Sequence, residues 1–472
     1  MASKSCLVFI LLICFVLNSF SKPAHEENGF TSWVMRLESD VRNRILSTGL
    51  CSVCKLLAFV AQIALLTNKI EADVVYEGRL LCKELKIEDS RVCTDVISEF
   101  RNEILTVADK AFLDPIELCG SLLGPSCAHA RDLGEFWNLT VPGNKPPVKP
   151  VPPPKPGSPV SRVLHFSDVH LDHLYQEGSD PDCGEPLCCR KNDKPPAPGK
   201  PKAGKYGDYQ CDIPAITFES MLQHISSTHQ KEAINYASQL LEKYMPGVTI
   251  FPAVGNHEGA PVNSFPPPFI TGDNSNQWLR DALANDWIQW LPNDTIPTIH
   301  KGIFYTVYMS KGFRIISINM NYCNNMNWWL LIDNYDPAHQ LQWLIDTLQE
   351  AEDNGEKVHI IGHIPPGSGD CLTPWSWNYY RIINRYESTV TAQFFAHTHL
   401  DEFEIFYDEK TRKRPTKYYT KSARHDSCDD SCRKYTLCRM MSGRSHDDSA
   451  CTLNTTLTQE EKHSFDQSLD FC

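Results

Sequence analysis

The stretch VTIFPAVGNHE, residues 248–258, decides the fold that this sequence predicts. It begins as an apolar, strand-like run and ends in Asn256 and His257, two polar residues placed directly after the run. Similar runs lie on both sides, with helical patterns between them: RVLHF at 162–166, FRIISIN at 313–319, KVHIIG at 357–362 and TAQFFA at 391–396. Because strands that alternate with helices form α/β domains, residues 161–408 are predicted to form an α/β body.

Four of these runs are followed by potential metal ligands. Open α/β sheets place their binding residues just beyond the carboxyl ends of the strands, so the four clusters can converge. Imidazole nitrogens, a carboxylate and an amide oxygen form a mixed set suited to zinc, iron or manganese. A lone histidine is more often structural, but four ordered clusters favour a metal site. The candidates are Asp168, His170, Asn256, His257, His363, His397 and His399.

The composition indicates an exported protein. The 472 residues include 19 cysteines and 32 prolines, and a cytosolic protein of this size rarely carries so many thiols. Residues 1–22 contain a lysine, an apolar run and small residues, the pattern of a signal peptide. Its removal would leave 17 cysteines, an odd number. Glycosylation sequons at Asn138, Asn293 and Asn454 fit a secretory route.

The charge argues against nucleic-acid binding, and the hydropathy argues against a transmembrane segment. A net charge of −13 gives little support to nucleic-acid binding, which relies on basic surfaces. A membrane span needs about 20 apolar residues, and no stretch of the sequence qualifies. We therefore expect no nucleic-acid partner and no transmembrane segment.

Three segments flank or precede the α/β body. Residues 44–131 hold six cysteines among helical patterns such as CKLLAFVAQIALL, whose apolar residues cover more than one face. Residues 141–160 contain nine prolines and are predicted to form an extended linker. Residues 420–472 are polar, carry five cysteines and are predicted to form a small helical region held by disulfides.

The ordered clusters D-x-H, G-N-H-E, G-H and x-H-x-H resemble those of the calcineurin-like metallophosphoesterases. The cysteine spacing at 44–131 resembles that of saposin B-type domains, and the strings FPAVGNHE, PVNSFPPPF, HIIGHIPPG, WSWNYYRI and AQFFAHTHLDEFE narrow the resemblance to the acid sphingomyelinases. This resemblance implies two mixed sheets flanked by helices, preceded by an all-α saposin domain and followed by a small helical, disulfide-rich tail.

The resemblance also implies a function. It predicts a di-zinc phosphodiesterase, secreted or lysosomal, that hydrolyses sphingomyelin to ceramide and phosphocholine and reaches sphingomyelin-containing membranes through its saposin domain. His257 would be a proton donor or charge stabiliser near the leaving group. The first zinc would be held by Asp168, His170 and His399, and the second by Asn256, His363 and His397.

The same resemblance implies a disulfide pairing in which Cys472 has no partner. The implied bonds are Cys51–Cys127, Cys54–Cys119, Cys82–Cys93, Cys183–Cys188, Cys189–Cys211, Cys323–Cys371, Cys428–Cys432 and Cys438–Cys451.

This chain departs from the family pattern inside the α/β body. The family places an Asp that bridges both metals, followed by a further histidine, between the D-x-H and G-N-H-E clusters. Residues 213–255 contain no Asp and read as two helices, so the strand that should deliver it is missing. Asp208 and Asp212 are the two candidate substitutes. The chain is also shortened after residue 409, and Ala396 stands where the superfamily prefers Gly.

Two other functions stay open at this point. The chain could be a catalytically impaired, lipid-binding isoform that keeps the saposin domain and a degraded metal site. It could also be a phosphodiesterase with a different substrate, such as a nucleotide, although nucleotides require no lipid-binding domain. Two divalent metals without a bridging carboxylate would repel each other, which argues against full activity.

Overall fold

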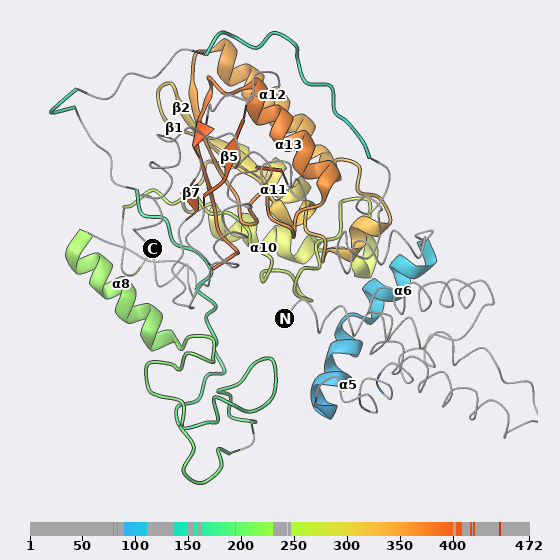
Figure 1. Ribbon diagram of the computed structural model, residues 1–472, viewed down its shortest axis with the longest axis vertical. Helices are drawn as coiled ribbons and strands as arrows, with labels where there is room; N and C mark the ends of the chain where they lie inside the picture. The colour runs from blue at the N-terminus through green and yellow to red at the C-terminus, as the bar shows by residue number, and fades with distance from the viewer. Residues whose placement is uncertain are drawn as a thin grey trace, which may run out of the picture.

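The computed structural model describes most of the predicted α/β body and parts of its flanks (Figure 1). The described residues are 79, 83, 89–110, 136–148, 155–158, 163–193, 195–229, 243, 247–399, 403–407, 416–417, 419–420 and 443–444. The predicted signal peptide, most of residues 44–131, most of the predicted tail and Asn454 lie outside them. So do these cysteines: Cys51, Cys54, Cys82, Cys119, Cys127, Cys428, Cys432, Cys438, Cys451 and Cys472.

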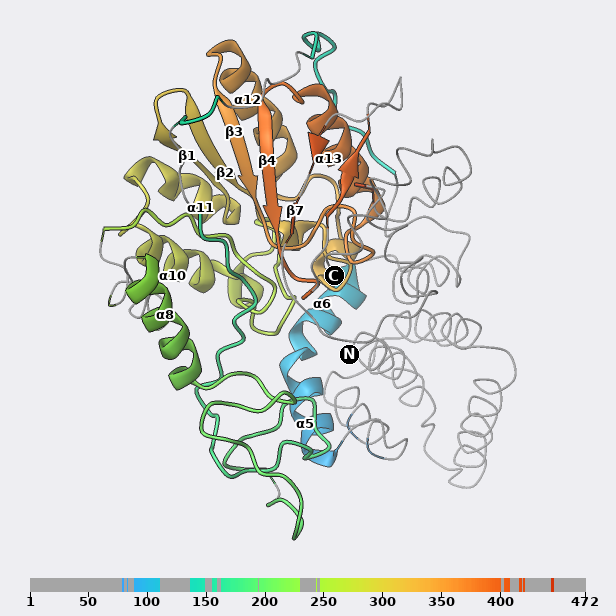
Figure 2. The same cartoon turned by 60° about the vertical axis from the view of Figure 1, so that its left-hand side comes forward.

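A five-stranded mixed sheet forms the centre of the body (Figure 2). Its order is β1 (Tyr305–Ser310), β2 (Phe313–Ser317), β3 (Lys357–Ile361), β4 (Val390–Phe395) and β7 (Tyr419–Thr420). β1 pairs antiparallel with β2, and the other neighbours are parallel. A second sheet holds only the antiparallel pair β5 (Ile405–Phe406) and β6 (Thr416–Lys417). The α/β body is therefore confirmed, while the described part of the second sheet is antiparallel rather than mixed.

The parallel strands are joined by two helices that lie side by side on one face of the sheet (Figures 1 and 2). α12 (Gln340–Asp353) connects β2 to β3, and α13 (Thr373–Arg385) connects β3 to β4. α12 buries an apolar stripe at helical spacing, Leu341, Leu344, Ile345 and Leu348. This stripe packs on strand residues such as Val358 and Ile360 to form the main core. The remaining short helices of this part are η3 (Met320–Tyr322), η4 (Trp328–Leu331) and η5 (Pro337–His339).

A second core lies beside β1. It is formed by α10 (Gln277–Trp287) and α11 (Ile296–Gly302), which pack with Val254, Phe265 and Tyr305. Two short helices, η1 (Gly272–Asn274) and η2 (Asn293–Thr295), precede α10 and α11. This core holds the segment that leads to Asn256, so it positions one of the predicted ligand clusters.

Two of the predicted strands are wrong. Residues 163–166 and 248–254 run through the body without forming a strand. The segment between them contains α8 (Ala215–His229), a predicted helix that buries Phe218 and Leu222. A strand requires a hydrogen-bonded neighbour, and the described residues include no strand between these two segments. The Pro252 carbonyl instead accepts from the hydroxyls of Tyr305 and Ser317, at 2.8 and 3.0 Å.

The helical N-terminal segment contacts the α/β body. α5 (Ser90–Glu99) begins after Asp89, whose carboxylate accepts from the Arg91 amide, and it contains the disulfide-bonded Cys93. α6 (Arg101–Lys110) follows and packs on η4, where Val107 joins a buried cluster with Ile270 and Trp329. Both helices agree with the helical pattern predicted for this segment.

The residues just before the proline-rich linker and its first residues contact α13 and the loop that follows it. The Leu139 amide donates to the Asn378 side chain at 2.8 Å, and Arg385 donates to the Pro142 carbonyl at 2.7 Å. Lys145 forms an ion pair with Glu387 at 2.7 Å. Residues 141–148 and 155–158 form no helix or strand, as predicted for an extended linker, but its first residues are anchored to the body.

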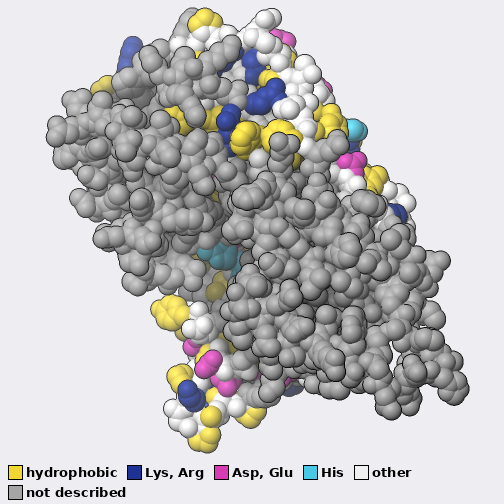
Figure 3. Space-filling model, turned by 45° about the vertical axis from the view of Figure 1, so that its right-hand side comes forward, with side chains coloured by type: hydrophobic (Ala, Val, Ile, Leu, Met, Phe, Trp, Pro, Cys, Tyr) yellow, Lys and Arg dark blue, Asp and Glu magenta, His cyan; other side chains and the backbone are white. Residues whose placement is uncertain are grey.

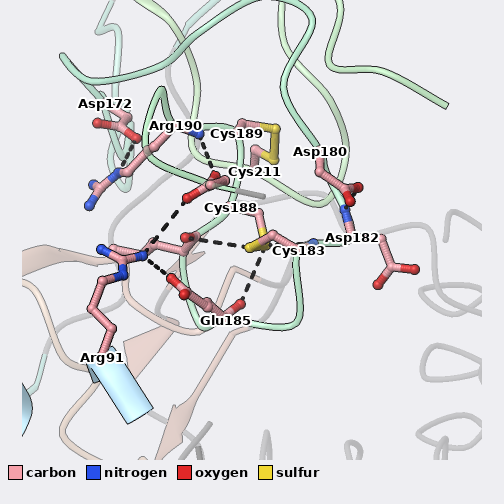
Figure 4. The surroundings of a disulfide bond; sticks show 12 residues. Arg91, Asp172, Asp180, Asp182, Cys183, Glu185, Cys188, Cys189, Arg190 and Cys211 are labelled. Carbon is pink, nitrogen blue, oxygen red and sulfur yellow. Dashed lines mark hydrogen bonds and ion pairs between the residues drawn. A yellow bond between two sulfur atoms is a disulfide. The ribbon is translucent and has the colours of Figure 1, made fainter. Parts of the chain in front are cut away.

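Residues 171–213 form a loop-rich excursion held by the bonds Cys183–Cys188 and Cys189–Cys211 (Figure 4). Arg91 of α5 reaches this loop and pairs with Glu185, with Asp193 at 3.9 Å. A third bond, Cys323–Cys371, joins the loops that follow β2 and β3. All three pairs agree with those that the family resemblance implies.

One buried polar pair between α13 and β4 allows a test of this core. Tyr379 donates its hydroxyl to the Gln393 side-chain oxygen, and both residues are almost fully buried. We expect Tyr379→Phe to lower the free energy of unfolding by about 1–2 kcal/mol, because the Gln393 oxygen would lose its donor in a site that excludes water. Denaturant unfolding would measure it, with Tyr209→Phe on the exposed loop as the control. Equal stabilities for the two variants would contradict this account.

No helix of the described part has the length and apolar character that a membrane crossing requires.

Candidate metal centre

The predicted ligands converge at the carboxyl ends of β3 and β4. His363 follows β3, and His397 and His399 follow β4. Asp168 and His170 reach the same place from the segment at 163–166, and Asn256 from the segment at 248–254. Figure 3 shows histidine side chains, coloured cyan, inside a recess near the middle of one face of the molecule. The two segments thus deliver their ligands without being strands.

The first ligand group brings together Asp168, His170 and His399. One potential ligand atom from each lies within 4.8 Å of the others. Among these atoms, His399 Nε2 lies 3.3 Å from Asp168 Oδ1. These are the three residues predicted to hold the first metal.

The second group brings together Asn256, His363 and His397. His363 Nε2 lies 2.9 Å from Asn256 Oδ1 and 3.3 Å from His397 Nδ1. The two groups meet at Asp168, whose Oδ1 lies 3.7 Å from His363 Nε2. Five donor atoms thus form a continuous series. It runs from His399 Nε2 through Asp168 Oδ1 to His363 Nε2, which neighbours both Asn256 Oδ1 and His397 Nδ1.

These donors fit a divalent metal such as zinc. In a tetrahedral site with zinc–nitrogen distances of about 2.0–2.1 Å, neighbouring donor atoms lie roughly 3.3–3.4 Å apart. The separation of His363 Nε2 from His397 Nδ1, 3.3 Å, matches that value, and its separation from Asn256 Oδ1 is shorter, at 2.9 Å. Burial lowers the pKa of His363 to about 3, so its ring is neutral and able to donate a lone pair. Gly255 leaves little space at this point, because a Cβ there would lie 3.3 Å from His363 Cε1 and 2.8 Å from Glu258 Oε2.

The electrostatics favour a charged carboxylate at the point where the groups meet. Burial raises the pKa of Asp168, but contacts with the His399 ring, the Ser167 hydroxyl and the His397 amide outweigh it and hold that pKa well below its usual range. The Ser167 and His397 contacts measure 2.6 and 3.0 Å. Asp168 is therefore ionised and held from several sides.

The backbone of four ligands is strained. Asp168, His170, His397 and His399 all have positive φ, between 48° and 72°. For residues other than glycine this region costs about 1–2 kcal/mol each, and such residues cluster at functional sites. The D-x-H and H-x-H clusters thus adopt sharp turns that bring both members of each pair toward the same centre.

The predicted proton donor lies beside the first group. The His257 ring is 4.5 Å from that of His170, measured between centroids. Burial, together with the neighbouring His170, lowers the pKa of His257. Of the two candidate substitutes for the bridging Asp, Asp212 lies next to His170, at 3.5 Å, whereas Asp208 belongs to neither ligand group.

Sequence patterns did not indicate the residues that orient Asn256. Its amide nitrogen donates to Asn263 Oδ1 at 2.8 Å, which turns the side-chain oxygen of Asn256 toward His363. Asn324 donates to the same Asn263 oxygen at 3.0 Å and so determines which way Asn263 faces. The only available signal was the position of Asn263 within the string PVNSFPPPF and of Asn324 beside Cys323.

A second group of potential metal ligands among the described residues does not form a metal site. It consists of Cys183, Glu185 and Asp193 in the excursion. Cys183 is bonded to Cys188, so its sulfur is not available as a thiolate.

Comparison with known proteins agrees with this centre. A family model described as calcineurin-like phosphoesterase matches residues 161–401. Sphingomyelin phosphodiesterase of Homo sapiens is 44% identical over 393 residues, which cover 77% of this chain and 61% of the human protein. Sphingomyelin phosphodiesterase 2 of Caenorhabditis elegans is 33% identical over 422 residues, which cover 80% of this chain and 68% of the worm protein.

The chain thus spans about three fifths of the length of its human relative. The matched residues, 161–401, contain the positions of all the predicted ligands, from Asp168 to His399. This chain belongs to the sphingomyelin phosphodiesterases of the calcineurin-like phosphoesterase family.

Proposed function

We propose that this protein is a metal-dependent phosphodiesterase that hydrolyses sphingomyelin to ceramide and phosphocholine. The observation that carries the proposal is the continuous series of donor atoms in which both ligand groups meet at Asp168. The relatives named sphingomyelin phosphodiesterases support this choice of substrate.

The ligands have distinct roles in this proposal. Asp168, His170 and His399 would hold one zinc ion, and Asn256, His363 and His397 a second. Bound divalent metals would polarise the phosphoryl oxygens and lower the pKa of water toward 7. Asp168 would take the place of the family's bridging carboxylate in part, since its Oδ1 faces both groups. His257, beside the first group, would deliver a proton to the ceramide oxygen as it leaves.

Access to a lipid substrate requires a membrane-binding surface. We assign this role to the predicted saposin domain at 44–131, of which α5 and α6 are described. The disulfides support an oxidising location, so we further propose that the protein is secreted or lysosomal. The linker at 141–160 would join the lipid-binding domain to the metal centre.

Metal removal tests the proposed reaction directly. We expect the purified full chain to release phosphocholine from sphingomyelin liposomes near pH 5. Treatment with a chelator should abolish the release and added zinc should restore it, because the ligand residues alone cannot activate water. Zinc content per chain, measured on the same sample, distinguishes one occupied group from two.

The same experiment decides between the proposal and its alternatives. No phosphocholine release, together with less than one zinc per chain, would refute hydrolysis and favour the impaired, lipid-binding isoform. In that case, flotation of the full chain with sphingomyelin liposomes would test lipid binding. Zinc-dependent cleavage of a nucleotide phosphodiester without cleavage of sphingomyelin would favour the second alternative.

A further inference from the structure

One ligand histidine in the first group faces a carboxylate outside that group. His170 Nδ1 lies 3.5 Å from Asp212 Oδ1. Asp212 is not part of the set formed by Asp168, His170 and His399, so it contacts a ligand rather than completing the set. The backbone keeps it there, because the Ile213 amide donates to the His170 carbonyl at 3.0 Å.

The second group has a matching arrangement. His397 Nδ1 faces His363, and its other ring nitrogen, Nε2, lies 3.4 Å from Asp370 Oδ2. Asp370 is held by its backbone, since its amide donates to the Ser368 hydroxyl at 3.2 Å and its carbonyl accepts from the Asn325 amide at 2.8 Å. Each group therefore contains one histidine with a ring nitrogen that faces an aspartate outside the ligand set.

Both aspartates are neighbours of disulfide-bonded cysteines. Asp212 follows Cys211, which is bonded to Cys189, and Asp370 precedes Cys371, which is bonded to Cys323. The two bonds tie each aspartate to a second segment of chain. The carboxylates are thus held beside their histidines by covalent and backbone constraints.

The charge of the ligand set explains why such carboxylates matter in this chain. The six predicted ligands include one carboxylate, Asp168, whereas two divalent cations bring four positive charges. The family's bridging carboxylate has no counterpart in residues 213–255. Carboxylates that accept from the free nitrogen of a ligand histidine orient its ring, raise its basicity and add negative charge near the metal.

We propose that Asp212 and Asp370 are positioning residues for metal binding, Asp212 acting through His170 and Asp370 acting through His397. They hold the two rings by one nitrogen each, Nδ1 of His170 and Nε2 of His397. They also supply two negative charges near a centre that lacks the bridging carboxylate. The inference rests on the proposed function only in its assignment of the metal ligands.

The test is metal affinity, measured without substrate. The full chain and its variants are stripped of metal and titrated with Co²⁺ against a competing chelator, and the cobalt absorption reports how the ligands surround the ion. We expect Asp212→Asn and Asp370→Asn each to weaken cobalt binding about 10- to 100-fold, the usual effect of removing an outer partner. The effects should multiply in the double variant, because the two aspartates act on different histidines.

Two controls separate this role from a loss of folding. Asp208→Asn lies in the same excursion as Asp212 and should bind cobalt like the unmodified chain. In a His170→Ala background, Asp212→Asn should have no further effect, because its target ring is absent. Unfolding of the metal-free variants should match that of the unmodified chain.

The inference is overturned if both aspartate variants bind cobalt as tightly as the unmodified chain, or if the unmodified chain takes up no cobalt. A chain that binds cobalt with the expected dependence on Asp212 and Asp370 but releases no phosphocholine would refute the proposed function and support the inference. The two failures are therefore distinguishable.

Discussion

Replacing Asp168 with Asn should abolish the metal centre while leaving the fold intact. Asp168 is the carboxylate at which the two ligand groups meet, within 3.3 Å of His399 Nε2 and 3.7 Å of His363 Nε2. Asn keeps the shape of the side chain but removes the charge that attracts the cations. We expect metal affinity to fall by more than about 100-fold, beyond the effect of losing an outer partner.

Phosphocholine release should fall with the metal. Bound metals contribute several kcal/mol of charge stabilisation in the transition state, so the rate should drop by about 1,000-fold or more. The measurements are metal content and phosphocholine release from sphingomyelin liposomes. Asp182→Asn, at an exposed position of the excursion, serves as the control and should retain both. An Asp168→Asn variant that keeps its metal and its activity would show that the groups do not depend on this carboxylate.

The second large effect concerns Glu103, a carboxyl group buried between α6 and the α/β body. Its side chain is 3% exposed. Burial raises the pKa of Glu103 to about 7 from an ordinary value of 4.5, although contacts with Ser264 and the Trp328 backbone lower it. The helix that carries it packs on η4, where Phe100 and Trp328 are in ring contact at 5.2 Å. The folded protein therefore prefers this group uncharged.

The sign of the pH effect follows from this preference. Below pH 4.5 Glu103 is protonated in both the folded and the unfolded chain and costs nothing. Between pH 4.5 and 7 only the unfolded chain releases the proton, so stability falls as pH rises. Above pH 7 the full cost applies, about 3 kcal/mol for a shift of this size.

Glu103→Gln should remove this cost because glutamine is neutral at every pH. We expect the variant to match the unmodified chain near pH 4 and to be more stable by about 3 kcal/mol near pH 8. Denaturant unfolding followed by tryptophan fluorescence measures the difference, since Trp328 and Trp329 lie at the contact. Glu99→Gln, on the exposed side of α5, is the control. Identical pH dependence in the unmodified chain and the Glu103→Gln variant would contradict the assignment.

Much of the α/β body could be predicted because its signals are local. The runs that became β2, β3 and β4 are apolar and β-branched, and the helical stripe in α12 repeats at the correct spacing. The ligand clusters were also visible as short strings after those runs. His363, His397 and His399 converge because the parallel strands β3 and β4 end at the same edge of the sheet.

Other features depend on partners that a local pattern does not contain. Residues 163–166 and 248–254 have strand-like composition, yet neither forms a strand because no described neighbour offers a hydrogen-bonding edge. β1 was not predicted, although it pairs with β2 along its length. Whether a run of this composition becomes a strand is decided by the segment beside it.

The sequence by itself determined the residue types of the metal centre, their order along the chain and the absence of an Asp between 213 and 255. Only the tertiary structure decided that Asp168 lies between the two ligand groups, that Asn263 orients Asn256, and that Asp212 and Asp370 face ligand histidines. The physical reason is distance. Ligand chemistry belongs to each residue, whereas orientation and charge compensation arise between residues that are far apart in the chain and meet only when it folds.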